Sequence, residues 1–282
     1  MLHLHRRLAV FAVVAACAAA APFAQAPATP PTEAAIEQFL RDGKIVRTRS
    51  AGKGVTGSIR ATLTDGTLTH DAQIQTVDES KREFSTAKGV ERDFRDSWTY
   101  NVAAYRLSRL LDLRMVPVSV ERRWNGRDAA FTWWVDDVAM DEEKRMKEKA
   151  QPPRSDCWLE QMHLLRMFDE LIENTDRNMG NILYTRDWRI WAIDHTRAFR
   201  RSSTPANLAK LTRIERGVLQ KLQALDFPTL KKEVGRYLLD SDIRTLLSRR
   251  DALVKHFVSR GEVALYDRQD ACRSDIPGAA QQ

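Results

Sequence analysis

The chain has 282 residues, of which 43% are hydrophobic and 29% are charged. This is enough for one sizeable core with two lobes or for two small domains, so we expect a folded, enzyme-sized protein. The formal charge of +7 comes from basic residues mixed with acidic ones, as over residues 141–149, and no aromatic-basic stripe accompanies it. That pattern is typical of a solvated surface and argues against specific binding of nucleic acid.

Residues 1–26 have the pattern of an export signal. Arg6 and Arg7 precede an apolar run over residues 8–21, and the small-residue site Ala-Gln-Ala follows over 24–26. Because this run is shorter than the roughly 18 residues that a membrane span requires, a cleaved signal peptide is favoured over a permanent anchor. We therefore predict an exported protein, periplasmic or secreted, with no transmembrane span after signal removal.

The three cysteines are relevant to the predicted export and membrane attachment of the protein. Cys17 ends a weak lipoprotein-like box over residues 14–17, so lipid attachment there is an alternative to simple cleavage. Cys157 and Cys272 remain in the mature chain, and in an oxidising compartment they could pair or stay as two free thiols. The sequence leaves both arrangements open.

The first half of the mature chain reads mostly as β-structure. A Pro/Ala/Thr-rich tether and a short helix lead into strands predicted at 44–49, 58–64 and 72–77, with a glycine-containing turn over 52–57. This turn, GKGVTG, lacks the G-K-[ST] ending and the following helix of a Walker loop, so an ordinary hairpin turn explains it. An amphipathic helix is predicted over 97–113, followed by strands at 115–122 and 131–135.

The second half reads mostly as helix, apart from two short strands at 182–184 and 190–193. We predict an α+β, bilobal fold with the functional site between the lobes. The predicted segments are a signal peptide 1–26, a tether with a short helix 27–43, a small antiparallel β N-lobe 44–138, an inter-lobe linker 139–154, a mostly helical C-lobe 155–262 and a C-terminal tail 263–282.

The chemically informative stretch is ENTDRNMGNILYTRDWRIWAIDHTRAFR, residues 173–200. Asp176 and Asn181 have the D-x-x-x-x-N spacing of a phosphoryl-transfer loop, in which the Asp receives a hydroxyl proton and the Asn holds a metal ion. Asp194 ends the second of the two short strands. A hairpin between Asn181 and Asp194 brings both to one edge, where their oxygens could share a Mg²⁺ ion that bridges the phosphates of ATP.

Each of these residues also has an ordinary structural explanation. Asp176 could cap a turn, Gly180 could supply an unusual backbone angle, and Asp194 could end a strand with its carboxylate solvated. Their joint order, downstream of a β-rich lobe, favours the kinase-like interpretation over three unrelated explanations.

The segments DRNMGN and WAIDHTRAF resemble the D-R-H-x-x-N and I-D-F/H signatures of the phosphoinositide 3/4-kinase-like branch, which includes HipA-type bacterial kinases and secretory-pathway kinases. NVAAYRLSRLLDLRMVPVSVER resembles the N-lobe helix and strand of those proteins more loosely, so the resemblance covers most of residues 44–260. It implies a bilobal, protein-kinase-like fold, ATP and Mg²⁺ as cofactors, and a hydroxyl acceptor on a protein, a lipid or a sugar.

By that resemblance Asp176 is the catalytic base, Arg177 steadies the loop, and Asn181 and Asp194 bind the metal ion. Asn178 departs from the usual histidine of the signature.

Two further departures affect the nucleotide side of the site. A kinase pairs a lysine on its third strand with a helix glutamate to hold the phosphates, and the corresponding positions are Gln75 and Asn101. These neutral amides can hydrogen-bond to one another but supply no positive charge. Lys53 in the glycine-containing turn, or Lys81, could supply it instead, although each could equally be an exposed surface lysine.

Three functions therefore remain open. The first is transfer of the ATP γ-phosphate to a hydroxyl group, and the second is a catalytically inactive, pseudokinase-type protein that binds a nucleotide or a partner. Metal-dependent phosphoester hydrolysis ranks last, because it would need a second set of metal ligands.

Several other residues near the predicted site each have one functional and one structural interpretation. Trp133 or Trp134 could stack on adenine or lie in the core. His195 could contact phosphate or make a structural hydrogen bond, and Arg197 and Arg200 could hold an acidic substrate or cover the surface.

Overall fold

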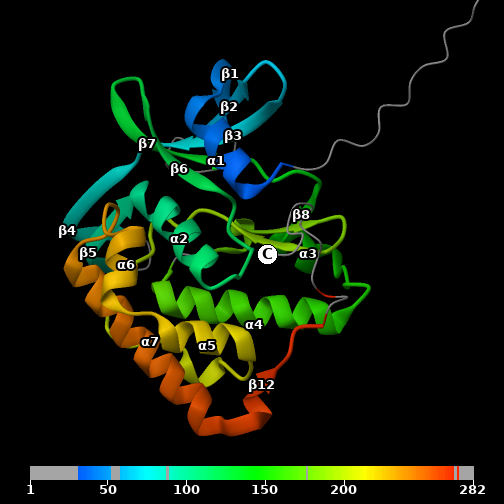
Figure 1. The fold of residues 1–282 in the computed structure, drawn as a ribbon, viewed down its shortest axis with the longest axis vertical. Helices are drawn as coiled ribbons and strands as arrows, with labels where there is room; N and C mark the ends of the chain where they lie inside the picture. The colour runs from blue at the N-terminus through cyan, green and yellow to red at the C-terminus, as the bar shows by residue number, and fades with distance from the viewer. Residues whose placement is uncertain (1–30, 52–57, 87–88, 176, 270–271, 273–282) are drawn as a thin grey trace, which may run out of the picture.

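The computed structural model describes residues 31–51, 58–86, 89–175, 177–269 and 272. A β-rich N-terminal lobe lies above a helical C-terminal lobe (Figure 1). The predicted signal peptide, Lys53 and Asp176 lie outside the described residues. Within the described part of the chain, no helix combines the length and the apolar character that crossing a bilayer requires.

The N-terminal lobe is built on a five-stranded antiparallel sheet of order β1-β2-β3-β7-β6. Side chains alternate along its central strands, so that Leu63, Ile74 and Phe131 are almost completely buried. The strands are β1 (Lys44–Ser50), β2 (Ile59–Thr64), β3 (Thr69–Gln75), β6 (Ser119–Trp124) and β7 (Arg127–Trp133). The predicted meander of three strands is confirmed.

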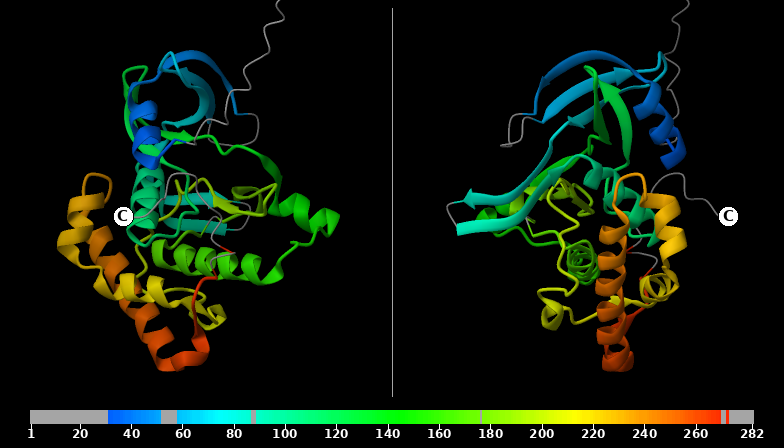
Figure 2. Two further views of the ribbon diagram at one scale, coloured as in Figure 1. Left: turned by 45° about the vertical axis from the view of Figure 1, so that its right-hand side comes forward. Right: turned by 90° about the vertical axis from the view of Figure 1, so that its left-hand side faces the viewer.

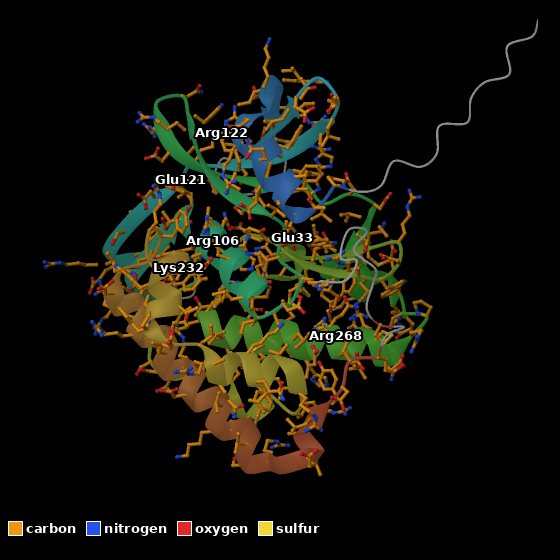
Figure 3. The ribbon with its side chains drawn as sticks, viewed as in Figure 1. Glu33, Arg106, Glu121, Arg122, Lys232 and Arg268 are labelled. Carbon is orange, nitrogen blue, oxygen red and sulfur yellow. A yellow bond between two sulfur atoms is a disulfide. The ribbon has the colours of Figure 1, made fainter. Side chains whose placement is uncertain are left out.

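Helix α1 (Glu33–Asp42) packs on β6 and β7 through Phe39 and Leu40. Arg122 of β6, labelled in Figure 3, donates hydrogen bonds of 3.1 Å to the Leu40 carbonyl and 2.8 Å to the Gly43 carbonyl. These bonds satisfy carbonyl groups that the end of a helix leaves without partners. The arginine thereby fixes α1 to the sheet.

Two strands, β4 (Asp78–Thr86) and β5 (Gly89–Ser97), form a hairpin that was not predicted from the sequence. Figure 2 shows it in cyan, projecting from the body of the protein. Its sequence is dense in charge, and its aromatic pair Phe84 and Phe94 stack on each other with ring centroids 4.2 Å apart. The hairpin thus has too few apolar residues to produce the alternation by which strands are recognised. The predicted helix follows it as α2 (Thr99–Leu110).

The C-terminal lobe surrounds the long helix α4, whose buried residues recur at helical spacing from Met162 to Ile172. A three-stranded sheet of order β10-β9-β8 lies against it. The remaining elements are α3 (Glu142–Glu148), α4 (Ser155–Ile172), α5 (Arg216–Ala224), α6 (Phe227–Val234), α7 (Asp240–Arg260), β8 (Val138–Asp141), β9 (Ile182–Thr185), β10 (Ile190–Ala192), and the short parallel pair β11 (Ile214–Glu215) and β12 (Leu265–Tyr266). Residues 139–154, predicted as a linker, contain most of β8 and all of α3.

The two lobes are joined by ion pairs as well as by the chain. Arg106 and Arg109 of α2 lie 3.9 and 3.5 Å from the Glu233 carboxylate of α6. Glu121 of β6 accepts a 2.6 Å hydrogen bond from Arg236. Figure 3 labels Arg106 and Glu121 at this junction. Helix α2 is therefore anchored to the C-terminal lobe.

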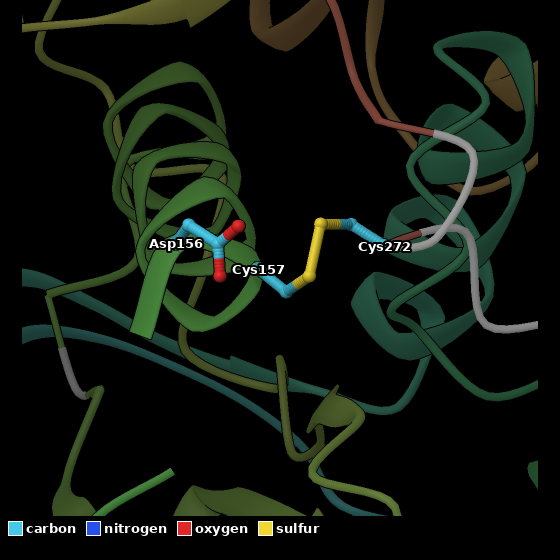
Figure 4. A group of neighbouring side chains, drawn as sticks. All are labelled: Asp156, Cys157 and Cys272. Atoms are coloured by element: carbon cyan, nitrogen blue, oxygen red, sulfur yellow. A yellow bond between two sulfur atoms is a disulfide. The ribbon is translucent and has the colours of Figure 1, made fainter. Parts of the chain in front are cut away.

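Cys157, at the start of α4, forms a disulfide with Cys272, 115 residues further along the chain (Figure 4). The structure thus resolves the choice between a bridge and free thiols. Asp156 lies beside the bridge and pairs with Arg154 at 2.8 Å. Because disulfide sulfurs are not thiolates, these three neighbouring side chains are not a metal site.

Removing this disulfide should lower the free energy of unfolding by about 2–4 kcal/mol, since the bridge restricts the unfolded chain. The measurement is urea unfolding of the wild type and of the Cys157→Ser/Cys272→Ser double variant, each with and without reductant. Reductant should bring the wild type to the stability of the variant and leave the variant unchanged. A variant that is as stable as the oxidised wild type would contradict the prediction.

Candidate active site

Asn181 and Asp194 lie at the same end of the β9–β10 hairpin. Asn181 is the last residue of a short 3-10 turn that runs directly into β9, and Asp194 comes two residues after β10. Ile182 pairs with Ala192 in the ladder, and the Ile193 amide donates a 3.1 Å hydrogen bond to the Asn181 carbonyl. The hairpin therefore brings together the two residues proposed from the sequence as metal ligands.

Asp194 has an unusual backbone conformation. Its φ angle is 54°, in the left-handed region that few residues other than glycine, asparagine and aspartate occupy. Its Oδ1 atom accepts hydrogen bonds from the Thr196 hydroxyl at 3.0 Å and the Thr196 amide at 3.4 Å. A strained conformation held by local bonds is frequent at functional sites. Gly180, by contrast, is not among the residues with positive φ, so the special backbone angle suggested for it is wrong.

Arg177 connects the loop between α4 and β9 to its surroundings. Its guanidinium donates to the Asp169 carboxylate of α4 at 3.0 Å, to the Asn181 carbonyl at 3.1 Å and to the Ile193 carbonyl at 2.6 Å. The planar fork of an arginine suits such simultaneous contacts. Arg177 thus fastens together the two backbone segments that carry Asn181 and Asp194.

The side chains of Gln75 and Asn101 form hydrogen bonds with different partners. Gln75, at the end of β3, is 2% exposed, and its side chain contacts the Ser58 hydroxyl at 3.1 Å and the Thr76 amide at 3.0 Å. Asn101, on α2, accepts a 2.8 Å hydrogen bond from the His195 amide. Asn101 therefore connects α2 to the residue that directly follows Asp194. Neither amide brings a positive charge to the site.

His195 is 1% exposed, and its ring packs edge-on against Phe168. Its Nε2 atom has no hydrogen-bond partner among the described residues. Burial, with a contribution from the nearby Arg177 charge, holds the pKa of this histidine well below its usual value of 6.5. His195 is therefore a neutral, buried side chain, which favours the structural interpretation over phosphate contact.

A His195→Gln variant should make stability less sensitive to acid. The unfolded histidine binds a proton as the pH falls below about 6.5, whereas the folded one does not, so the wild type loses up to ~1.4 kcal/mol per pH unit from this group. Urea unfolding of both proteins at pH 5, 6, 7 and 8 measures the effect. As the pH is lowered below 6.5, the free energy of unfolding of the wild type should decrease relative to that of the variant. A difference between the two proteins that does not change with pH would refute the conclusion that His195 is neutral in the folded state.

The other candidate side chains around the site are already engaged. Glu91 of β5 pairs with Arg197 at 2.5 Å and also with Arg200, so these arginines contact the hairpin. Lys81 lies 2.7 Å from Glu79 on the same hairpin. The two tryptophans also have ring partners: Trp133 stacks on His70 at 3.4 Å, and Trp134 lies under Arg60 at 4.1 Å.

Asp96, near the end of β5, was not predicted as a site residue from the sequence. This carboxylate is 5% exposed and lies opposite Glu79 of β4. Burial raises its pKa, and the neighbouring negative charge of Asp194 adds to the effect. An Asp-Ser pair before a helix ordinarily indicates helix capping, so only the unpredicted hairpin could have located this residue near Asp194.

Comparison with solved structures identifies the architecture. The structure of hydra Fam20 with sugar matches 84% of this chain and 92% of its own length, with a TM-score of 0.63 at 14% identity. The Golgi casein kinase with Mn/ADP bound matches with a TM-score of 0.58 at 14% identity, over 84% of this chain and 80% of that one. The chain has a kinase-like fold.

A bacterial protein, the Helicobacter pylori proinflammatory kinase CtkA, also matches, over 78% of this chain and 98% of its own, with a TM-score of 0.52 at 10% identity. No known sequence family matches the chain, and no curated protein matches it. The bilobal, atypical kinase-like fold expected from the loop signatures is therefore confirmed.

Proposed function

We propose that this protein is an ATP-dependent phosphotransferase that moves the γ-phosphate to a hydroxyl group of a protein, a lipid or a sugar. The observation that carries the proposal is the placement of Asn181 and Asp194 at one end of the β9–β10 hairpin, fastened by Arg177. In a kinase-like fold this is where a divalent ion meets the nucleotide phosphates.

The residues present fit such an ion. An amide oxygen from Asn181 and a carboxylate from Asp194 are the hard oxygen ligands that Mg²⁺ prefers, and these two would hold it. The bound ion would neutralise the charge that develops on the transferred phosphate. Asp176, five residues before Asn181, has the spacing of the residue that accepts the proton of the acceptor hydroxyl. The chain's own contribution is to position these groups.

The neutral residues Gln75 and Asn101 favour a second candidate, a catalytically inactive protein that binds a nucleotide or a partner. Without the usual lysine, nucleotide affinity and turnover both lose a source of positive charge. The retained Asp176, Asn181 and Asp194 favour catalysis, since a protein freed from chemistry has no physical need for all three. The two candidates differ in whether bound ATP is consumed.

Thermal unfolding with ATP, Mg²⁺, both or neither tests the nucleotide site. A ligand that binds only the folded state stabilises it by ~2.7 kcal/mol at a hundredfold excess over its dissociation constant. We expect stabilisation that requires both ATP and metal and is lost in Asp194→Ala. Asp251→Ala, at an exposed aspartate of α7 far along the chain, is the matched control and should behave as the wild type.

The outcome separates the candidates. Stabilisation accompanied by ADP release when acceptors are supplied supports the kinase, and stabilisation without any turnover supports the inactive binder. No shift at millimolar ATP with Mg²⁺ or Mn²⁺ refutes nucleotide binding altogether.

A further inference from the structure

Asp96 lies beside the proposed metal ligand Asp194, although the two are almost a hundred residues apart in sequence. The Ser97 amide donates a 2.8 Å hydrogen bond to the Thr196 carbonyl, which joins the end of β5 to the segment after β10. Asp96 immediately precedes one partner of this bond, and Asp194 lies two residues before the other. The hairpin β4–β5 therefore delivers a second carboxylate to the site.

The two carboxylates compete for one hydroxyl. Thr196 Oγ1 donates to Asp194 Oδ1 at 3.0 Å, and the same side chain is the hydrogen-bond partner of Asp96. A threonine hydroxyl has a single proton, so it satisfies only one carboxylate at a time. Asp96 Oδ1 is buried and has no hydrogen-bond partner within the described part of the chain. A buried carboxylate in this state is costly unless a cation joins it.

The charged groups that act on Asp96 are two carboxylates, Asp194 and Glu79, and one cation, Arg197. Glu79 lies directly opposite Asp96 in the hairpin and is paired with Lys81. Arg197 contributes positive charge to Asp96 but also forms the ion pair with Glu91. Gln75 and Asn101, at the positions that the resemblance assigns to the ion pair of a kinase, are neutral.

We propose that Asp96 and Asp194 together hold a divalent cation, and that this ion supplies the positive charge that the neutral Gln75 and Asn101 do not. The inference rests on the proposed function, because it adds a ligand and a cation to the same phosphate-binding site. Oxygen ligands from two carboxylates select Mg²⁺ or Mn²⁺ over softer metals. The base of the β4–β5 hairpin is then part of the metal site.

The test is Mn²⁺ titration of the purified protein, followed by electron paramagnetic resonance, with and without ADP. Asp96→Asn keeps the size of the side chain and removes its charge. It should weaken Mn²⁺ binding at least about tenfold or lower the number of bound ions by one. Asp93→Asn, at a 60% exposed position of the same strand, is the matched control and should bind Mn²⁺ as the wild type does.

Thermal unfolding supplies a second readout that does not depend on activity. Without metal, Asp96→Asn should be at least as stable as the wild type, because it removes a buried charge whose Oδ1 atom has no hydrogen-bond partner among the described residues. Added Mn²⁺ should raise the melting temperature of the wild type more than that of the variant.

Unchanged Mn²⁺ affinity and stoichiometry in Asp96→Asn overturn the inference, while metal-dependent ADP binding that is lost in Asp194→Ala leaves the proposed function standing. If the wild type binds neither Mn²⁺ nor ADP, the inference and the proposed function fail together.

Discussion

Replacing Arg249 with methionine is expected to lower the free energy of unfolding by about 3–5 kcal/mol, the cost of breaking a buried ion pair from one side. Arg249 of α7 is completely buried and lies 3.2 Å from the Glu173 carboxylate. It also donates to the carbonyls of Leu171 at 2.8 Å, Arg200 at 3.1 Å and Ser202 at 2.5 Å. Burial lowers its pKa to about 10, so it remains charged at neutral pH.

Urea unfolding measures this loss. Lys255→Met, at an exposed position of the same helix, is the control and should change stability by less than about 0.5 kcal/mol. A loss below ~1 kcal/mol in Arg249→Met would mean that Glu173 and the three carbonyls find other partners. The expected large loss would show that α7 holds the segments on both sides of the proposed catalytic loop.

The second large effect is expected from Arg177→Ala. The substitution leaves Asp169 and two backbone carbonyls without their shared donor, so we expect a loss of about 3–5 kcal/mol in stability together with the loss of ATP- and metal-dependent stabilisation. Arg177→Lys should recover part of both, because lysine restores the charge but not the planar fork.

Comparison with Arg249→Met shows whether Arg177→Ala loses binding because the metal ligands are misplaced or because the whole fold is destabilised. At a temperature where both variants are folded, Arg249→Met should still bind Mn²⁺ and ADP, and Arg177→Ala should not. Equal binding by the two variants would show that Arg177 acts only on stability.

The features that were predicted from the sequence are those whose residue pattern lies within one short segment of the chain. The loop signature around Asn181 and the apolar strand before Asp194 are separated by a short hairpin, so their proximity follows from chain geometry alone. The roles of Gln75 and Asn101 could not be predicted in the same way. Their positions suggested an ion pair replaced by amides, whereas their partners, Ser58 and His195, come from other segments of the fold.

The β4–β5 hairpin was not predicted because it is stabilised by contacts between residues of different segments. The hydrophobic pattern within one segment gives no sign of such contacts. One aromatic stack and the ion pairs from Glu91 to Arg197 and Arg200 replace a regular apolar face. Asp96 was missed with it, since a carboxylate before a helix has a simpler local explanation.

The hydrogen bond from the His195 amide to Asn101 couples movement of helix α2 to movement of the segment that carries Asp194. A rotation of α2 must either break this buried bond or carry residues 195 and 196 with it, and Asp194 follows because it is their neighbour in the chain. Movement of α2 and a change in the geometry of the proposed metal ligands are then one event. Hydrogen exchange at the His195 amide would report that event directly.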